Sequence, residues 1–354
     1  MSRSLRYAIV GAGMMGHEHI RNLELVEGAE VVAIADPHSE SRWWSQQVSK
    51  HELAEFTDVE SLLAGASIDA VIVASPNHTH REVLTPLFDT DLAIFCEKPL
   101  CTTLEDARWV ADRAANHRGL FWVGMEYRYM APVARLIDEV HGGAIGTLRM
   151  LAIREHRYPF LPKVNNWNRF SRNSGGTFVE KCCHFFDLMR LVTRDEPALV
   201  YASAAQDLNH LDETYAGETP DILDNGFVTI DFERGSRALL DLCMFAEASE
   251  NEQEIVATGD LGKIEASVPD GRVVVGTRSP RKLESEVLAI DPTVLAAGAH
   301  FGSTFVEHRE FIRAVEQDLP ASVTAEDGLR AVAIGVAAER SAVAREPIAM
   351  GSLL

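Results

Sequence analysis

The segment 175–187 combines a glycine pair with the titratable side chains Glu180, His184 and Asp187. Their spacing of four and three residues would place all of them on one face of a helix. An imidazole can accept a hydroxyl proton near neutral pH, and a neighbouring carboxylate can orient it. The spacing therefore predicts a proton-transfer site, whereas a lone helical histidine is more often a packed or capping residue.

Other chemistries fit this segment poorly. Glu180 and His184 alone are too few ligands for a metal, and the adjacent Cys182 and Cys183 would point to different sides of a helix. A disulfide between adjacent cysteines would close a strained ring. The five cysteines form no C-x-x-C pair, which favours free thiols in a reducing cytoplasm and predicts no metal site.

A second motif, Gly11-Ala12-Gly13-Met14-Met15-Gly16, is a G-x-G-x-x-G pattern between a predicted strand and a predicted helix. Glycines here permit a tight turn and let backbone amides approach a pyrophosphate at the helix N-terminus. Asp36 follows Gly16 by twenty residues and can bind both ribose hydroxyls. The motif predicts a dinucleotide site with NAD favoured over NADP, although Arg42 could stabilise a 2′-phosphate. The alternative is a glycine-rich turn in an α/β domain that binds nothing.

The elements that must position these residues differ between the two parts of the chain. Up to residue 124, short apolar runs at 7–10, 30–35, 70–74, 93–96 and 121–123 alternate with helical patterns, which is typical of a doubly wound parallel Rossmann sheet. Residues 125–354 carry mostly two-residue periodicity, as in Val228, Ile230 and Phe232, with predicted helices at 132–140, 178–192, 305–316 and 326–340. We therefore expect an NAD(P)-binding domain at 1–124. A second α+β domain at 125–354 should hold a mainly antiparallel sheet with helices on one face, and its C-terminal helices could pack back on the first domain.

Composition limits the partners. The chain of 354 residues has 46% hydrophobic and 24% charged residues, and 33 Lys and Arg against 53 Asp and Glu give a net charge of −20. A surface this acidic repels nucleic acid and anionic membranes, so a small molecule is the expected partner. No signal peptide or membrane-spanning run is evident, which predicts a cytoplasmic protein. The uncovered face of the second sheet predicts a homo-oligomer.

Charge is distributed unevenly along the second part. Residues 149–172 contain six Lys and Arg opposed by Glu155 alone, whereas residues 195–233 contain none. The acidic stretch is typical of a solvated loop, and 209–221 is long enough for a lid. The basic stretch predicts a locally less acidic pocket mouth.

Several short motifs together resemble one known family. They are the glycine motif, Ser75-Pro76-Asn77-His78-Thr79-His80, Glu97-Lys98-Pro99, Gly175-Gly176 leading to His184 and Asp187, and Phe311 followed by 323–329. Over nearly the whole chain this pattern is similar to the glucose-fructose oxidoreductase, inositol dehydrogenase and rhizopine catabolism (Gfo/Idh/MocA) oxidoreductases. The family's usual aspartate and following glycine are replaced here by Glu180 and Cys182.

The resemblance implies roles for single residues. Lys98 would be the catalytic, nicotinamide-adjacent lysine, in a Lys-Pro peptide that is often cis, and its ammonium could stabilise a forming alkoxide. His184 would transfer the hydroxyl proton, helped by Glu180 or Asp187. The residues implied to line the cofactor are Gly11, Gly13, Met14, Met15, Gly16, Asp36, Ser75, Pro76, Asn77, His80, Glu97 and Lys98.

Aromatic and polar side chains interleave before the glycine pair, which suits the apolar faces and hydroxyls of a cyclic polyol. The candidate substrate-binding residues are Lys98, Arg128, Tyr158, Lys163, Trp167, Arg169, Glu180 and His184. Trp167 and Arg169 resemble a Trp-Arg pair of the family with one residue inserted. His300 is a further candidate pocket histidine, in a loop between Gly298 and Gly302.

The resulting expectation is an NAD-dependent dehydrogenase that oxidises a secondary hydroxyl of a sugar or inositol. One alternative is an NADPH-dependent keto-sugar reductase, which runs the same chemistry in reverse. Two others are a non-catalytic dinucleotide-sensing regulator and a glycosidase that uses bound NAD transiently. A dimer or tetramer is expected from the family resemblance.

Overall fold

The computed structural model describes residues 4–353, which form two compact units. One contains the residues up to Glu126 together with Lys163–Trp167 and Asp291–Val332. The other contains Tyr127–Pro162, Asn168–Ile290 and the residues from Ala333 onward. Each unit is therefore assembled from segments that are far apart in the sequence.

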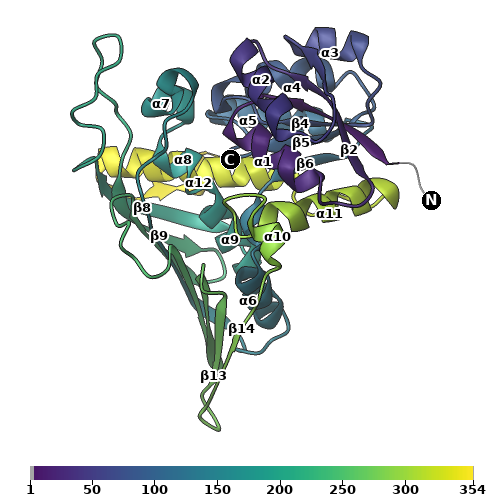
Figure 1. The fold of residues 1–354 in the computed structure, drawn as a ribbon. Helices are drawn as coiled ribbons and strands as arrows, with labels where there is room; N and C mark the ends of the chain where they lie inside the picture. The colour runs from purple at the N-terminus through teal and green to yellow at the C-terminus, as the bar shows by residue number, and fades with distance from the viewer. Residues whose placement is uncertain (1–3, 354) are drawn as a thin grey trace. The chain divides into compact units, whose positions relative to one another are not determined.

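The first unit contains the parallel, doubly wound sheet that the sequence predicts. Its strand order is β3-β2-β1-β4-β5-β6, and every neighbouring pair is parallel. The strands are β1 (Leu5–Val10), β2 (Ala29–Ala35), β3 (Ala54–Phe56), β4 (Ala70–Val73), β5 (Ala93–Glu97) and β6 (Phe121–Gly124). The connecting helices are α1 (Met14–Leu23), α2 (Ser39–Val48), α3 (Val59–Gly65), α4 (His80–Leu87) and α5 (Leu104–Ala114) (Figure 1). Strands β4, β5 and β6 are buried along their whole length, because helices cover both faces of such a sheet.

A distant segment completes the core of this unit. Helix α11 (Ser303–Glu316) packs on α1, and the buried Phe311 ring contacts the rings of Tyr7, Phe95 and Trp122 at centroid distances of 6.2, 5.6 and 6.0 Å. Val123 N–H donates to the Val323 carbonyl at 3.1 Å, just before α12 (Ala325–Ala344). The segment 291–332 is therefore part of the core that carries the first sheet.

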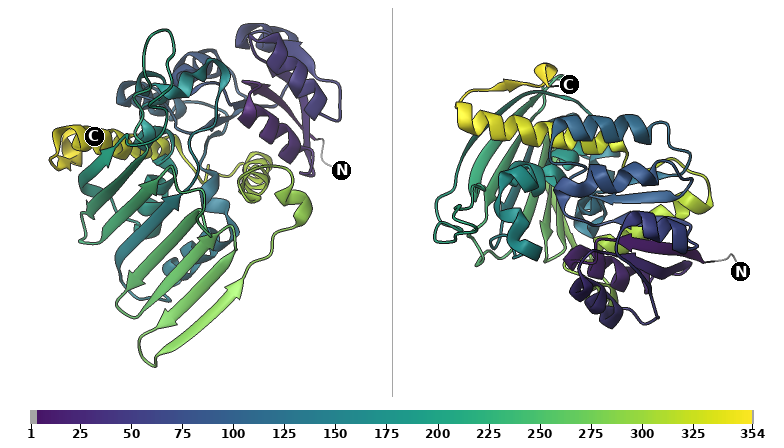
Figure 2. Two further views of the ribbon diagram at one scale, coloured as in Figure 1. Left: turned by 60° about the vertical axis from the view of Figure 1, so that its left-hand side comes forward. Right: turned by 90° about the horizontal axis from the view of Figure 1, so that it is seen from above.

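The second unit contains a mixed but mostly antiparallel sheet, as predicted (Figure 2). Its order is β14-β13-β12-β11-β7-β10-β9-β8-β15, and only the β7–β10 pair, among residues 4–353, is parallel in this sheet. The strands are β7 (Leu148–His156), β8 (Pro197–Ala205), β9 (Asn225–Phe232), β10 (Arg237–Cys243), β11 (Gln253–Gly259), β12 (Gly262–Val268), β13 (Arg272–Thr277), β14 (Lys282–Val287) and β15 (Ile348–Ala349). Strands β14 and β15 were not expected, because β14 alternates too little and β15 is too short for a periodic signal.

Helices pack on one face of this sheet, and the other face carries exposed apolar side chains. Helices α6 (Ala131–His141) and α9 (Cys183–Thr193) pack on one face, where they contact β7, β11, β12 and β13. Val228, Ile230 and Phe232 are buried on β9. On β9 the intervening residues are exposed, and 57% of the Phe227 surface is accessible. The exposed large apolar side chains on the same sheet include Met150, Leu199, Tyr201 and Leu239.

The helix predicted at 178–192 is interrupted, so this expectation was wrong in its continuity. Helix α8 (Thr177–Glu180) ends before Lys181, and α9 begins at Cys183. The amides of Lys181 and Cys182 both donate to the Thr177 carbonyl, at 2.9 and 3.3 Å, which closes a turn between the helices. Glu180 and His184 therefore lie on two successive short helices. The remaining short elements include α7 (Ser171–Ser174) and α10 (Pro292–Leu295).

Among residues 4–353, no helix is both long and apolar enough to cross a membrane.

Candidate active site

The glycine motif forms a loop between β1 and α1 that leaves backbone amides accessible. Gly11 has φ +98°, and a Cβ there would lie 2.4 Å from Ser75 N. A Cβ at Gly16 would lie 2.2 Å from the Gly11 carbonyl oxygen, whereas one at Gly13 would meet no atom within 4 Å. Gly13 is the N-cap of α1, so no side chain of the cap residue occupies the first amides of the helix. Such a cradle fits the pyrophosphate of a dinucleotide.

Asp36 lies directly after β2 at the same edge of the sheet. Its carboxylate accepts hydrogen bonds from the amides of Ala12 and His38, both at 2.8 Å, which fixes its position beside the glycine loop. The Arg42 guanidinium donates to the Asp36 carbonyl at 2.7 Å and pairs with Glu55 at 3.2 Å. A carboxylate and a guanidinium therefore lie side by side at the place where the glycine motif positions the adenosine ribose. The carboxylate favours a free 2′-hydroxyl, and the guanidinium favours a 2′-phosphate.

We expect Asp36→Asn to raise the ratio of NADP to NAD in kcat/KM by about tenfold or more, equivalent to ~1.4 kcal/mol. The substitution removes a negative charge that repels a 2′-phosphate, while Arg42 remains to attract it. Steady-state kinetics with both cofactors would measure the ratio. Asp89→Asn, which changes an exposed carboxylate of the same unit, serves as the control. An unchanged ratio in Asp36→Asn would contradict this role.

The loop 75–80 is held by hydrogen bonds of its own side chains, and the cofactor contacts implied for its residues stay predictions. Thr79 Oγ1 donates to Ser75 Oγ at 2.8 Å, and Asn77 is buried. His80 is fully buried, with Nδ1 3.0 Å from the Pro99 carbonyl and Nε2 3.1 Å from the Ser75 carbonyl. Its ring has no surface for a cofactor. Instead, His80 joins this loop to the Lys98–Pro99 segment, whose peptide bond is cis as the resemblance implies.

Lys98 follows β5, and a chain of buried histidines lies behind it. Glu97 Oε2 accepts from the Lys98 amide at 3.2 Å, and Glu97 Oε1 lies 2.9 Å from His19 Nε2. His19 Nδ1 in turn lies 2.9 Å from Nε2 of His308 on α11. Burial opposes the Glu97 charge, but the His19 hydrogen bond and the Lys98 ammonium hold the pKa of Glu97 below its ordinary value. Burial also lowers the pKa of His308, which keeps that ring neutral.

His300 belongs to the same unit and contacts two carboxylates. Its Nδ1 lies 2.7 Å from Glu18 Oε1, and its Nε2 lies 3.6 Å from Glu126 Oε1. Burial alone would lower the pKa of His300, but Glu126 and Glu18 raise it above its ordinary value. For Glu18, the His300 contacts outweigh burial and lower the pKa to about 2. His300 is therefore a partner of carboxylates near Lys98, whose charge acts on it.

The second unit gathers the other predicted catalytic residues. The guanidinium of Arg128 binds both carboxylate oxygens of Asp187, with Nε to Oδ2 at 2.6 Å. One turn earlier on α9, the His184 ring stacks on Tyr127 with a centroid distance of 4.1 Å and an interplanar angle of 6°. Glu180, His184 and Asp187 are all buried. The Arg128 pairing means that Asp187 carries its negative charge in an ion pair beside His184.

The predicted substrate residues are divided between the two units. In the first unit, Lys163 Nζ lies 5.0 Å from the Trp167 ring centroid, and Trp167 contacts the His78 ring edge-on at 5.9 Å. In the second unit, Arg169 is buried and pairs with Glu213 at 2.8 Å. The division between the two units thus falls between Trp167 and Asn168, next to Arg169. Tyr158 is also in the second unit, where the Arg157 guanidinium lies 4.4 Å from its ring centroid.

Most of the positive charge along 149–172 is compensated by nearby carboxylates, while the less acidic pocket mouth stays a prediction. The arginines pair with carboxylates of the second unit, namely Arg149 with Asp260, Arg154 with Glu254, Arg157 with Glu155, Arg169 with Glu213 and Arg172 with Glu218. Two of these partners, Glu213 and Glu218, lie in the acidic stretch. Ion pairs therefore connect residues 209–221 to the basic segment 149–172. Apart from Arg157 with Glu155, these pairs join residues that are far apart in the sequence, as Arg169 and Glu213 are at a separation of 44.

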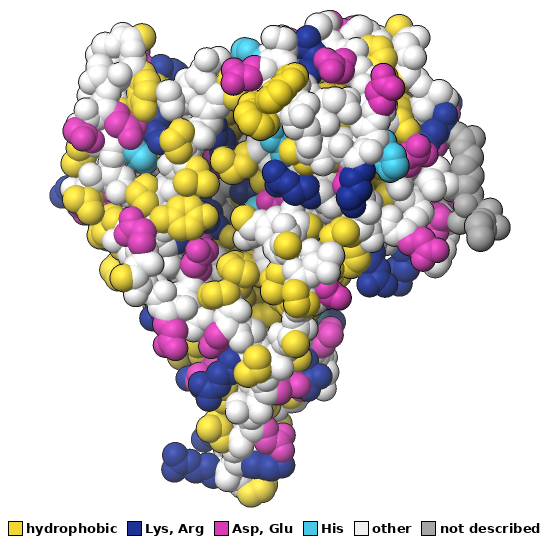
Figure 3. All heavy atoms as spheres, in the orientation of Figure 1, with side chains coloured by type: hydrophobic (Ala, Val, Ile, Leu, Met, Phe, Trp, Pro, Cys, Tyr) yellow, Lys and Arg dark blue, Asp and Glu magenta, His cyan; other side chains and the backbone are white. Residues whose placement is uncertain are grey.

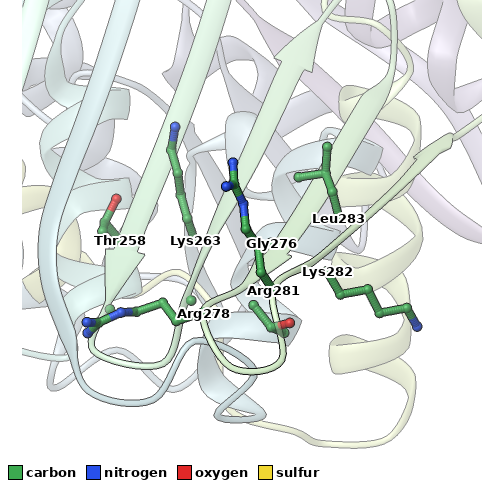
Figure 4. Close-up of a pocket in the computed structure, with 10 residues that line it drawn as sticks. Thr258, Lys263, Gly276, Arg278, Arg281, Lys282 and Leu283 are labelled. Atoms are coloured by element: carbon green, nitrogen blue, oxygen red, sulfur yellow. The ribbon is translucent and has the colours of Figure 1, made fainter.

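A cationic groove of about 470 Å³ lies elsewhere, between the β11–β12 and β13–β14 turns (Figure 4). Lys263, Arg278, Arg281 and Lys282 line it, and Lys and Arg side chains gather at this tip of the sheet in Figure 3. Lys263 pairs with Glu265, and Lys282 pairs with Glu284. None of the predicted site residues lines this groove.

The described residues contain neither a cluster of metal-ligating side chains nor a disulfide. Within residues 4–353, no group of three or more His, Cys, Asp and Glu side chains is arranged to hold a metal ion. All five cysteines are free thiols, and Cys182 and Cys183 are buried. Burial raises the pKa of the Cys182 thiol well above its ordinary range, which suppresses the reactive thiolate.

Glu339 on α12 supports the start of α8. Its Oε1 accepts from the Phe178 amide at 2.9 Å, and a Cβ at Gly176 would lie 2.3 Å from the same atom. Burial raises the pKa of Glu339 from 4.5 to about 7. Gly176 is needed here because its φ of +89° and the carboxyl group leave no room for a side chain.

We expect Glu339→Gln to raise stability at pH 8 but not at pH 4. A carboxyl whose pKa is raised on folding stabilises the protein fully below pH 4.5, and this contribution is lost as pH rises through about 7. The shift corresponds to on the order of 3 kcal/mol, and Gln still offers an oxygen to the Phe178 amide. Thermal unfolding at both pH values would measure the difference, with Glu346→Gln as an exposed control. Equal effects at the two pH values would contradict the prediction.

Several residues of these clusters escaped the sequence reasoning, namely Glu18, His19, Tyr127, Glu155, Lys181, His308 and Glu339. They lie in ordinary helices, strands or turns, and no motif marks their positions. Lys181 gave one signal, because it lies between the two positions where the chain departs from the family pattern, Glu180 and Cys182.

Comparison with known proteins agrees with the fold of both units. Residues 5–125 match the description "Oxidoreductase family, NAD-binding Rossmann fold", and residues 137–350 match "Oxidoreductase family, C-terminal alpha/beta domain". The chain is thus an oxidoreductase with an NAD(P)-binding Rossmann domain. It belongs to the Gfo/Idh/MocA family.

Relatives extend over the full length. The chain is 27% identical to myo-inositol 2-dehydrogenase of Thermotoga maritima over 95% of this chain and 96% of that protein. It is 25% identical to inositol 2-dehydrogenase of Rhizobium meliloti over 98% and 99% of the two chains. Among solved structures, levoglucosan dehydrogenase in complex with NADH and levoglucosan shares the fold, with a TM-score of 0.86 at 19% identity over 98% of this chain and 100% of that one.

Proposed function

We propose that this protein is an NAD-dependent dehydrogenase that oxidises a secondary hydroxyl of a cyclic polyol or sugar. The observation that carries the proposal is the buried His184, stacked on Tyr127 and one helical turn from the Arg128–Asp187 ion pair. Such a histidine is oriented for proton transfer. The names of the inositol dehydrogenase relatives support the substrate class.

Each residue then has a defined role. His184 accepts the hydroxyl proton. Either Glu180 or Asp187 helps to orient the His184 ring for this transfer. Lys98 stabilises the negative charge that develops on the substrate oxygen, and Glu97 holds the Lys98 backbone through its amide. When bound, the nicotinamide supplies the hydride acceptor. Gly11, Gly13 and Gly16 admit the pyrophosphate, and Asp36 binds the adenosine ribose.

The direct test is a panel of inositol isomers, sugars and L-sugars assayed by NADH absorbance with NAD and with NADP. We expect NADH formation with at least one cyclic polyol or sugar and a preference for NAD. No turnover with any member of the panel would overturn the proposed activity, whereas a strong NADP preference would overturn only the role of Asp36.

An NADPH-dependent keto-sugar reductase is the second candidate, because Arg42 lies beside Asp36. An arginine at this place can stabilise a 2′-phosphate. Assays of keto-sugars with NADPH separate the two candidates. The reductase requires that keto-sugars are reduced by NADPH faster than the corresponding sugars are oxidised by NADP under matched conditions.

Self-association through the open face of the second sheet is also proposed. Register places Tyr201 opposite Thr229 and Thr229 opposite Leu239, so these side chains form one row across β8, β9 and β10. Tyr201 and Leu239 are 39% and 37% exposed. Apolar rows of this kind are typical of surfaces that a second copy covers. Sedimentation analysis of the full chain would detect a monomer if the proposal is wrong.

A further inference from the structure

We infer that Tyr127 is a positioning residue for His184, and that the buried Lys181–Glu155 ion pair holds Tyr127 in place for this purpose. The inference rests on the proposed role of His184 as the proton acceptor. It adds supporting side chains that the motifs did not indicate. Tyr127 lies in the short helical turn Glu126–Tyr129, Glu155 lies on β7, and Lys181 lies between α8 and α9.

The contact between Tyr127 and His184 is a parallel stack. The ring planes differ by 6° at a centroid distance of 4.1 Å, and both side chains are buried. Stacking leaves the imidazole free to move in its own plane but opposes tilting, which would turn its nitrogens away from a substrate hydroxyl. Aromatic pairs of this kind contribute about 0.5–1.5 kcal/mol beyond the area they bury, enough to favour one ring orientation about two- to tenfold.

Tyr127 is itself fixed by a charged group. The Lys181 ammonium donates to Tyr127 Oη at 2.5 Å and pairs with Glu155 Oε1 at 2.8 Å. Arg157 also pairs with Glu155, at 3.3 Å, so the carboxylate is shared by two cations. A buried ion pair of this kind is costly to break, because removing one partner leaves an uncompensated charge. The phenol is thereby anchored at its oxygen while its face supports the imidazole.

The helix interruption explains why Lys181 can reach both partners. Lys181 lies in the turn between α8 and α9, outside either helix. From there its ammonium lies over the rings of Tyr127 and Phe185, 4.7 and 5.6 Å from their centroids. The charged groups near His184 come from several elements. Glu180 and Lys181 precede it in the chain, and Asp187 follows it on α9. The others are Arg128, next to Tyr127 in the chain, Glu155 on β7, and Arg157 just after β7.

The test compares Tyr127→Leu, Tyr127→Phe, Lys181→Met and Phe185→Leu in the full chain. We expect Tyr127→Leu to lower kcat by roughly ten- to a hundredfold with little change in KM, because a misplaced base slows the chemical step. Tyr127→Phe keeps the stacked ring and should stay within about threefold of the unmodified protein, while Lys181→Met should fall between the two. Phe185→Leu is the matched control, since it removes a buried ring next to His184 that meets Tyr127 edge-on at 5.7 Å.

A spectroscopic readout makes the result independent of turnover. In NMR spectra, the His184 ring protons should show the upfield shift of a stacked ring, assigned by their disappearance in His184→Gln. Tyr127→Leu should abolish this shift, whereas Tyr127→Phe and Phe185→Leu should preserve it. If Tyr127→Leu and Phe185→Leu affect kcat and the His184 signals alike, the inference is wrong. If the unmodified protein oxidises no polyol or sugar, the proposed function fails, and the NMR comparison still decides whether Tyr127 orients His184.

Discussion

Replacing Lys98 with methionine is expected to lower kcat by about a thousandfold while NADH binding persists. Removing one preorganised group that stabilises a developing oxyanion typically costs two to three orders of magnitude in rate. Methionine nearly matches the length of lysine but carries no charge. The measurement is steady-state kinetics with the best substrate of the polyol panel, together with NADH binding followed by fluorescence.

The Lys98 experiment has a matched control and a clear failure. Lys50→Met changes an exposed lysine of the same unit that pairs with Glu24 at 3.3 Å, and it should leave kcat unchanged. Lys98→Met that turned over at the rate of the unmodified protein would remove Lys98 from the mechanism. Loss of NADH binding together with activity would instead identify Lys98 as a cofactor-binding residue only.

Replacing His184 with glutamine is expected to lower kcat by roughly a hundred- to ten-thousandfold, the usual contribution of a positioned acid or base. Glutamine can hydrogen bond but cannot accept the proton. The defect should shrink as pH rises, because solvent removes the substrate proton more readily at high pH. A pH profile of kcat/KM for both proteins measures this.

His141→Gln is the control for His184, because His141 lies on α6 of the same unit and its Nε2 lies 2.9 Å from the Leu191 carbonyl oxygen. It should show no rate defect at any pH. A His184→Gln protein with an unchanged rate, or with a defect that is constant across pH, would exclude proton acceptance by His184. A constant defect would then point to Glu180 as the base, which Glu180→Gln would test.

Local sequence signals predicted most of the elements and the places of the candidate residues along the chain, although β3, β14, β15 and the break between α8 and α9 were not expected. The glycine motif sits between β1 and α1, Asp36 follows β2, and Lys98 follows β5, all as expected. This works because parallel strands bring their carboxyl ends to one edge, so a residue's place after its strand predicts its place in the sheet. The alternation of Val228, Ile230 and Phe232 predicted the buried face of β9 for a similar reason.

Tertiary structure alone decided which side chains meet. His19, Glu97 and His308 join across 289 residues of sequence, and Lys181 reaches Tyr127 across 54. Such contacts depend on which helix packs on which strand, and a single buried histidine or lysine leaves no periodic trace. The same holds for the interruption at Lys181 and Cys182, where the propensity for a continuous helix gave way to a turn beside a buried ion pair. The sequence by itself thus determined the class of chemistry, and packing decided how His184 is held.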